Sequence, residues 1–304
     1  MKTIYLSGKM TGVAEFNYPA FHRNAAFLRE NRWKVISPAE LDADLGINEN
    51  TVMTEEKYHE IIKHDYAALL QCDAVAFMPE WENSRGAKLE SKFANILKLE
   101  RYRVDADRDY FEKELIIGLA GVARAGKDTI AKEFVDNAGF KRTGFADSLK
   151  KMLYALNPIL PAPNWAEVGD GFGKDGTVRV KDYVDKFGWE GAKSNLAIRQ
   201  SLQILGTEAG RDVLGENIWV DTLFSKPTHA RLVISDVRYA NESQAIKQRG
   251  GYVIKIHRPG VVAANSHVSE VIDFETDFEV VNENTPEETY IAITDYLSSQ
   301  GVEL

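Results

Sequence analysis

The sequence predicts an α/β protein made of two parallel-sheet domains, and three observations support this prediction. Short apolar runs typical of strands alternate with segments of helical periodicity in both halves of the chain. This pattern favours parallel sheets covered by helices on both faces. A glycine-rich turn at residues 121–129 lies between one such run and one such helix. The chain has 304 residues, which is long for one domain and comfortable for two.

The N-terminal half begins with an apolar run at residues 4–6 that leads into a glycine-containing turn. We expect strands over residues 4–6, 33–36 and 74–78, and helices over residues 19–30, 57–70 and 87–98. This alternation predicts a Rossmann-like (flavodoxin-like) domain over residues 1–104. Residues 101–113 are rich in charge and lack an apolar period, so we expect a linker there, placed at residues 105–112. The second domain would then comprise residues 113–304.

The turn G-V-A-R-A-G-K-D-T at residues 121–129 has the spacing of a phosphate-binding loop. It follows an apolar run at residues 115–119 and opens a helical pattern at residues 130–135. Its glycines let backbone N–H groups point at phosphate oxygens, and the helix N-terminus and the Lys127 ammonium add positive charge. The alternative is an ordinary glycine-rich turn. The expected nucleotide-binding residues are Gly121, Arg124, Gly126, Lys127, Asp128 and Thr129.

Asp128 departs from the usual pattern, because it occupies the place where a Ser or Thr hydroxyl would ligate Mg²⁺. A carboxylate beside a triphosphate is repulsive unless a metal lies between them. Asp128 therefore either meets the Mg²⁺ or turns away to cap the helix. The sequence leaves both alternatives open.

A polar row follows in a helix expected over residues 198–214. Ile198, Leu202 and Leu205 would face the core. The opposite face would carry a polar residue at every fourth position, and such a face can grip a phosphate and hydrogen-bond a base edge. The alternative is a solvated face with a Glu208–Arg211 pair. The residues of this face are Arg199, Gln203, Thr207 and Arg211.

An apolar strand at residues 232–236 ends in the carboxylate of Asp236, the usual place for a group that orients Mg²⁺ or water in such sheets. Asp236 and Asp128 are the expected metal ligands, and Arg238 is an expected substrate-binding residue. The alternative is a structural Asp–Arg pair with a helix N-cap near Asn241.

Composition limits the function classes. The net charge of −9 argues against a protein that coats DNA or RNA, which would carry a basic excess. The single cysteine, Cys72, excludes an internal disulfide and fits a reducing compartment. The apolar runs are too short to span a bilayer. We therefore expect a protein of the cytoplasm (the host cytoplasm if phage-encoded), with neither nucleic acid nor membrane as a partner.

Five strings occur in order along the C-terminal half: GVARAGKDT, GFADSLKKML, GWEGAK, IRQSLQILGTEAGRDVLGENIWVD and VISDVRYANESQAIKQRGG. They resemble the bacteriophage deoxynucleoside monophosphate kinases, whose loop also carries G-K-D-T, over about residues 113–304. The resemblance implies a P-loop nucleoside monophosphate kinase domain that transfers the γ-phosphate of ATP to a deoxynucleoside monophosphate (dNMP), with Mg²⁺. Lys127, Arg199, Arg211 and Asp236 are the catalytic residues we expect. Alternatives are a kinase acting on a modified base within DNA, which the acidic balance disfavours, and a P-loop ATPase.

The N-terminal half resembles the nucleoside 2-deoxyribosyltransferase superfamily, which includes the dNMP N-glycosidases. The resemblance rests on Y-L-S-G at residues 5–8, on Asp65 and Asp73, and on S-R-G-A-K-L-E at residues 84–90. It implies that Glu90 is the nucleophile and Asp65 the general acid or base. Tyr5 would orient Glu90, and Ser84 and the loop around Gly8 would hold the 5′-phosphate.

The chemistry of these residues fits, because cleaving an N-glycosidic bond needs one carboxylate near C1′ and a second carboxyl group to protonate the leaving base. The alternatives are a first-turn acid at Glu90 with a solvated Asp65, and a non-catalytic module that senses a nucleotide and regulates the kinase. We expect a bifunctional deoxynucleotide enzyme that forms a homo-oligomer. The phosphate-binding residue that the superfamily takes from a neighbouring subunit has no identifiable counterpart here.

Overall fold

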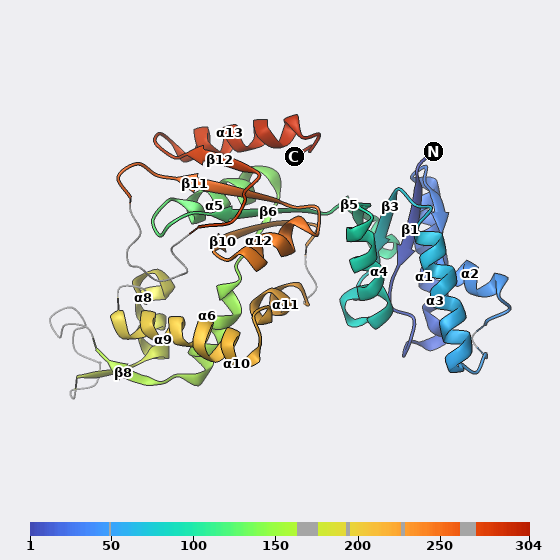
Figure 1. Cartoon of the computed structure of the whole chain (residues 1–304), viewed down its shortest axis with the longest axis horizontal. Helices are drawn as coiled ribbons and strands as arrows, with labels where there is room; N and C mark the ends of the chain where they lie inside the picture. Colours follow the sequence, from blue (N-terminus) through green and yellow to red (C-terminus); the bar gives the residue numbers. More distant parts are fainter. Residues whose placement is uncertain (49, 163–175, 193–194, 226–228, 262–271) are drawn as a thin grey trace. The chain divides into compact units, whose positions relative to one another are not determined.

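The protein is described from a computed structural model, which covers residues 1–48, 50–162, 176–192, 195–225, 229–261 and 272–304 (Figure 1). The chain divides into two compact units, residues Met1–Arg142 with Phe224–Leu304, and residues Thr143–Leu223. This division does not follow the expected boundary at residues 105–112, so the predicted domain organisation stays a prediction. No helix among the described residues is long and apolar enough to cross a membrane.

The first unit holds two five-stranded sheets, and the N-terminal one has the order β2-β1-β3-β4-β5. Strands β1, β2 and β3 pair in parallel, as expected. Strand β4, which was not predicted, also pairs in parallel with β3, whereas β5 runs antiparallel to β4. The expected helices are confirmed, and a short one, α2, was missed because its seven residues are too few to show a period. The strands are β1 Thr3–Ser7, β2 Lys34–Ile36, β3 Ala74–Phe77, β4 Glu100–Asp105 and β5 Tyr110–Lys113, and the helices are α1 Tyr18–Glu30, α2 Pro38–Asp44, α3 Glu55–Leu69 and α4 Arg85–Ile96.

The segment expected to be a linker is folded. Residues 100–113 form the β4–β5 hairpin, in which Asp105 pairs with Tyr110 and Tyr102 with Lys113. Its charges misled the prediction because several of them are buried in ion pairs, which a composition argument cannot see. Residue 114 alone separates β5 from β6, the first strand of the second sheet.

The second sheet has the order β12-β11-β6-β10-β7, and β6 pairs in parallel with both β10 and β11. Helices α5 and α13 pack on one face and α12 on the other (Figure 1). A Cβ at Gly118 would lie 2.6 Å from the Ile246 side chain, so this glycine lets α12 approach β6 closely. The elements are β6 Leu115–Ala120, α5 Lys127–Ala138, β7 Lys141–Thr143, β10 Arg231–Val237, α12 Ala240–Lys247, β11 Tyr252–His257, β12 Phe278–Val281 and α13 Pro286–Ser299.

The second unit is largely helical, with a two-stranded antiparallel ribbon. Its own apolar core contains Val180, Tyr183 and Ile198, with Leu202 and Leu205 packed against it, as the helical period predicted. The elements are α6 Ala146–Leu156, β8 Ile159–Pro161, β9 Thr177–Arg179, α8 Val180–Ala192, α9 Leu196–Gly206, the π-helical turn η4 Thr207–Arg211, α10 Asp212–Leu214 and α11 Ile218–Phe224.

Candidate functional site

The phosphate-binding loop lies between β6 and α5, so the expected strand–loop–helix arrangement is confirmed. Gly126 has a φ of +99° and stands at the N-cap of α5, a conformation that favours glycine. The Lys127 ammonium folds back over the loop, donating to the Gly121 carbonyl at 2.7 Å and to the Val122 carbonyl at 2.8 Å. Lys127 is only 7% exposed, so its charge is held inside the loop where a phosphate would enter.

Asn282 anchors this loop, and sequence reasoning missed it. Its Nδ2 donates to the Ala125 carbonyl at 2.9 Å, while its Oδ1 accepts from the Thr289 hydroxyl at 3.2 Å. A Cβ at Gly126 would lie 2.3 Å from that Nδ2, so any larger residue would displace the anchor. No local motif marks Asn282, because only the β11–β12 pairing brings it to the loop.

A cavity of about 540 Å³ adjoins the loop. It opens at the carboxyl ends of β11 and β12, the edge at which ligands bind in parallel sheets. Arg258 is exposed at its wall. The lining residues are Gly121, Val122, Lys255, Ile256, His257, Arg258, Pro259, Val261, Ile272, Val281 and Glu283.

Asp128 follows Lys127 in the first turn of α5 and is engaged by two side chains from neighbouring strands. Its Oδ1 accepts from the Ser235 hydroxyl at 2.7 Å and from Arg142 Nη2 at 2.9 Å. Arg142 also donates from Nε to Ser235 Oγ at 3.1 Å. The carboxylate therefore carries a counter-charge of its own, an arrangement that neither sequence-based alternative included.

Asp236 lies at an irregularity near the end of β10, where the pairing with β6 shifts register between Ile234 and Val237. Val237 pairs with Ala120, the last residue before the phosphate loop, so Asp236 is placed beside the loop and is half-buried. The alternative interpretation placed a helix N-cap near Asn241, and helix α12 does begin there. The N-cap residue of α12 is Tyr239, and the Glu242 carboxylate accepts from the backbone N–H groups of Arg238 and Tyr239.

The polar row predicted on one helix lies in the second unit and is interrupted by the π-turn. The Asn195 side chain caps α9, accepting from the N–H groups of Ala197 and Ile198. Within the described part of the chain, the Arg199 side chain makes neither a hydrogen bond nor an ion pair. Arg199, Gln203, Thr207 and Arg211 are all half-buried.

The π-turn shifts Arg211 off the regular helical spacing, because each of its hydrogen bonds spans five residues rather than four. The single regular helix expected over residues 198–214 is therefore wrong in this part. Arg211 donates from Nη1 to the Glu216 carbonyl at 2.9 Å, and the Glu208–Arg211 pair is not formed between these described residues.

In the N-terminal sheet, Glu90 of α4 meets two hydroxyl groups of β1. Tyr5 Oη donates to Glu90 Oε1 at 3.2 Å and Ser7 Oγ donates to Oε2 at 2.5 Å. Tyr5 and Ser7 are both fully buried, so they hold the carboxylate in a fixed direction. The role of Tyr5 was expected, whereas Ser7 was quoted within a motif without being given a role.

Asp65 of α3 belongs to the same buried cluster, near Tyr5 and Glu90. Burial, reinforced by the charges of Glu90 and Asp42, raises the pKa of Asp65 to about 8. Burial likewise raises the pKa of Glu90 to about 7, against the hydrogen bonds from Ser7 and Tyr5. The structure therefore brings together two buried carboxyl groups whose pKa values are both raised, and Glu90 is not a plain first-turn acid.

The residues expected to hold a 5′-phosphate have structural contacts of their own. The Ser84 hydroxyl accepts from the Ala87 N–H at 3.2 Å and so caps α4. A Cβ at Gly8 would lie 3.0 Å from Met78 Sδ and 3.1 Å from Phe21 Cζ, so Gly8 is required by packing. Both residues nevertheless stand at the carboxyl end of the sheet, beside the α4 N-terminus, where an anion is favoured.

The comparisons with known proteins divide the chain in two. Residues 174–293 match the family described as "Deoxynucleotide monophosphate kinase", and residues 2–101 match "Domain of unknown function (DUF4406)". A protein of Acanthamoeba polyphaga mimivirus, named "Putative deoxynucleotide monophosphate kinase", is 34% identical over 197 residues, which cover 59% of this chain and 94% of the relative. These matches support the kinase part of the resemblance; they support neither a bacteriophage origin nor a glycosidase.

The mimivirus relative is covered over almost its whole length. The chain belongs to the deoxynucleotide monophosphate kinase family, and its C-terminal region carries the kinase.

Proposed function

We propose that the C-terminal region transfers the γ-phosphate of ATP to dNMPs, and that the N-terminal sheet cleaves or exchanges the N-glycosidic bond of the same substrates. For the kinase, the observation that supports ATP as donor is the phosphate loop with Lys127 held inside it and a cavity at its side. In this proposal the triphosphate replaces the two carbonyl groups as the partner of the Lys127 ammonium. The cavity would take the nucleoside part of the donor.

A bound Mg²⁺ would neutralise part of the phosphate charge during the transfer. Asp236 fits this ion, because it precedes Val237, which pairs with the last residue of the strand leading into the loop, and Mg²⁺ takes one or two carboxylates together with phosphate and water oxygens. Among the described residues, no three His, Cys, Asp or Glu side chains form a group that could hold a metal ion. Binding of Mg²⁺ through one or two carboxylates does not require such a group. Asp128 is a poorer ligand, since Arg142 already neutralises it.

The Arg199 row is proposed to bind the dNMP acceptor. A half-buried arginine without a hydrogen bond to any described residue has its guanidinium donors available for a phosphate. Gln203 and Thr207 follow at helical spacing and would contact the base or sugar. Arg199→Leu should therefore cost far more in activity than in melting temperature, whereas equal losses would indicate a structural residue.

Lys127→Ala tests the kinase. We expect loss of ATP-dependent dNMP phosphorylation with the fold retained, because the charge that meets the transferring phosphate is gone. Lys132→Ala, on the exposed side of the same helix, is the matched control and should keep full activity. Near-normal turnover by Lys127→Ala would show that this loop is not the donor site.

For the N-terminal sheet, the supporting observation is the pair of carboxyl groups around Tyr5. In the proposed reaction, the Glu90 carboxylate attacks C1′ as the C1′–N bond breaks, and protonated Asp65 gives its proton to the departing base nitrogen. Water then cleaves the glycosyl ester with Asp65 as the base, which returns both groups to their starting states. If a second base accepts the sugar instead, the result is base exchange.

Release of free base from each dNMP, followed by chromatography, tests this proposal. Glu90→Gln should abolish base release and leave the kinase unchanged, while Glu60→Gln, an exposed residue of α3, should change neither. Ribonucleotides should react poorly, because a 2′-hydroxyl withdraws electrons from the oxocarbenium-like transition state. Tight dNMP binding without base release from any substrate would favour the sensing module instead.

A further inference from the structure

The contact between Arg142, Ser235 and Asp128 assigns a role to an arginine that no motif identified. The three residues come from β7, β10 and the first turn of α5, and each bonds the other two. Ser235 is only 2% exposed, so its hydroxyl fixes the Asp128 carboxylate from inside the sheet. The Arg142 side chain is 38% exposed and approaches the carboxylate from the solvent side.

A simpler account of Asp128 is that a carboxylate is favoured in the first turn of any helix. That account explains why a carboxylate suits the helix, but not why it occurs in a phosphate-binding loop, where the same position faces the phosphates of a bound nucleotide. Two like charges about 4 Å apart repel by about 1 kcal/mol even in water. The helix-based account also does not explain the contact with the buried Ser235 hydroxyl or the two hydrogen bonds that Arg142 donates.

We propose that Arg142 is the residue that makes a carboxylate tolerable in this phosphate loop. Its guanidinium cancels the charge of Asp128, and together with Ser235 it turns the Oδ1 atom away from the phosphates and into the sheet. Arg142 is thus a positioning residue of the kinase, acting through Asp128. The aspartate, in turn, is neither a direct metal ligand nor only a helix cap.

The pair predicts a specific pattern in a set of four variants. Arg142→Ala leaves an uncompensated carboxylate beside the phosphates, and both residues are partly exposed, so we expect ATP binding to weaken about tenfold. Asp128→Asn should bind ATP about as well as the wild-type protein, because the repulsive charge is absent. In the double variant, which combines Arg142→Ala with Asp128→Asn, the loss of ATP affinity caused by Arg142→Ala should disappear.

The measurement is the Kd of ATP by calorimetry, in the presence of EDTA so that the contribution of a metal is removed, with KM and kcat measured separately with Mg²⁺. The loss of ATP affinity in Arg142→Ala should be smaller in 1 M salt, because screening reduces repulsion between exposed charges. Lys132→Ala removes an exposed cation from the same helix and controls for net charge. Melting temperatures of all variants report whether the fold is retained.

Rescue by Asp128→Asn is the decisive result, since a residue that only holds β7 in place would not be rescued by removing a charge elsewhere. An equally weak Kd for the single and double variants would overturn the proposal and indicate that Arg142 contacts the phosphate itself. If the wild-type protein bound no ATP, the donor assignment would fail, and inorganic triphosphate would then probe the loop with the same variants. Equal triphosphate affinities of wild type and Arg142→Ala would also overturn the proposal.

Discussion

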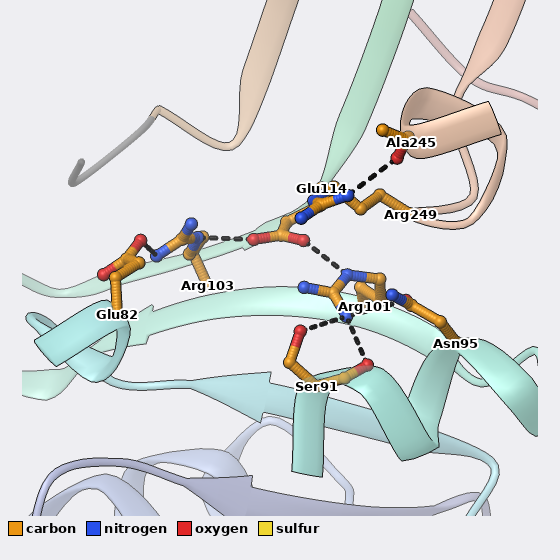
Figure 2. Close-up of polar contacts among 8 residues, drawn as sticks. All are labelled: Glu82, Ser91, Asn95, Arg101, Arg103, Glu114, Ala245 and Arg249. Carbon is orange, nitrogen blue, oxygen red and sulfur yellow. Dashed lines mark hydrogen bonds and ion pairs between the residues drawn. The ribbon is translucent and has the colours of Figure 1, made fainter. Parts of the chain in front are cut away.

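Glu114 should be among the most sensitive positions of the first unit. It is the single residue between β5 and β6, and its carboxylate lies between two arginines of β4 (Figure 2). Arg101 Nε is 2.7 Å from Glu114 Oε2, and Arg103 Nε is 2.5 Å from Oε1. All three side chains are buried, with exposures of 4% for Arg101, 11% for Arg103 and 6% for Glu114.

The magnitude of the effect follows from the charges in this cluster. Arg103 has a second partner, Glu82, at 2.8 Å, so the four side chains form a neutral set of two cations and two anions. Glu114→Ala leaves one buried guanidinium charge without a counter-charge, which typically costs about 3–5 kcal/mol. The bonds from Arg101 to Ser91 and Asn95 and its stacking on Phe77 soften the loss without supplying a negative charge.

Chemical denaturation and native-state hydrogen exchange of the full chain would measure this cost. The exchange of β4 and β5 amides is the sharper readout, because a chain with two sheets need not unfold in one step. Lys2→Ala is the matched control, since it breaks a pair with Glu100 at a residue that is 61% exposed, and should change stability by at most about 1 kcal/mol.

The pH dependence gives an independent check. Burial opposes ionisation of Glu114, but the charges of Arg101 and Arg103 outweigh it and hold the pKa of Glu114 below its ordinary value. A lowered pKa in the folded state means that the stabilisation is present above the unfolded pKa and is lost as pH falls through the folded pKa. The difference in free energy of unfolding between wild type and Glu114→Gln should therefore become smaller at acidic pH. A Glu114→Ala protein as stable as wild type at pH 7 would refute the reasoning.

Three further predictions concern the sites. Base release should follow a bell-shaped pH profile with its maximum between about pH 7 and pH 8, because Glu90 with a pKa of about 7 must be ionised and Asp65 with a pKa of about 8 must be protonated; a rate that only rises with pH would contradict these roles. Asn282→Ala frees the phosphate loop and should lower kcat/KM for ATP roughly tenfold with a nearly unchanged melting temperature, whereas a large drop in that temperature would make the anchor purely structural. A fragment of residues 1–105 lacks β5 and Glu114, the carboxylate shared by the two buried arginines, so it should be cleaved rapidly by protease; residues 1–114 should resist, and equal cleavage would argue against the hairpin.

The periodic elements could be predicted from sequence because their signals are local. Strand β6, the glycines of the loop and helix α5 lie next to one another in the chain, and each has a pattern that needs no distant partner. The catalytic candidates Glu90 and Asp65 were also accessible, through a resemblance carried by short motifs. The π-turn after Gly206 could not be foreseen, because its side-chain pattern resembles that of a regular helix.

What the sequence by itself determined is thus the α/β class, the glycine-rich loop with Lys127 between a strand and a helix, and the helical spacing of Arg199 and Gln203. The tertiary structure decided which partner each charged side chain contacts. The charged stretch expected as a linker forms a hairpin in which Glu114 neutralises Arg101 and Arg103, and the Asp128 carboxylate accepts a hydrogen bond from Ser235, 107 residues away. The physical reason is that a charge is stabilised or opposed by its neighbours in space, and strand pairing brings those neighbours from distant parts of the chain.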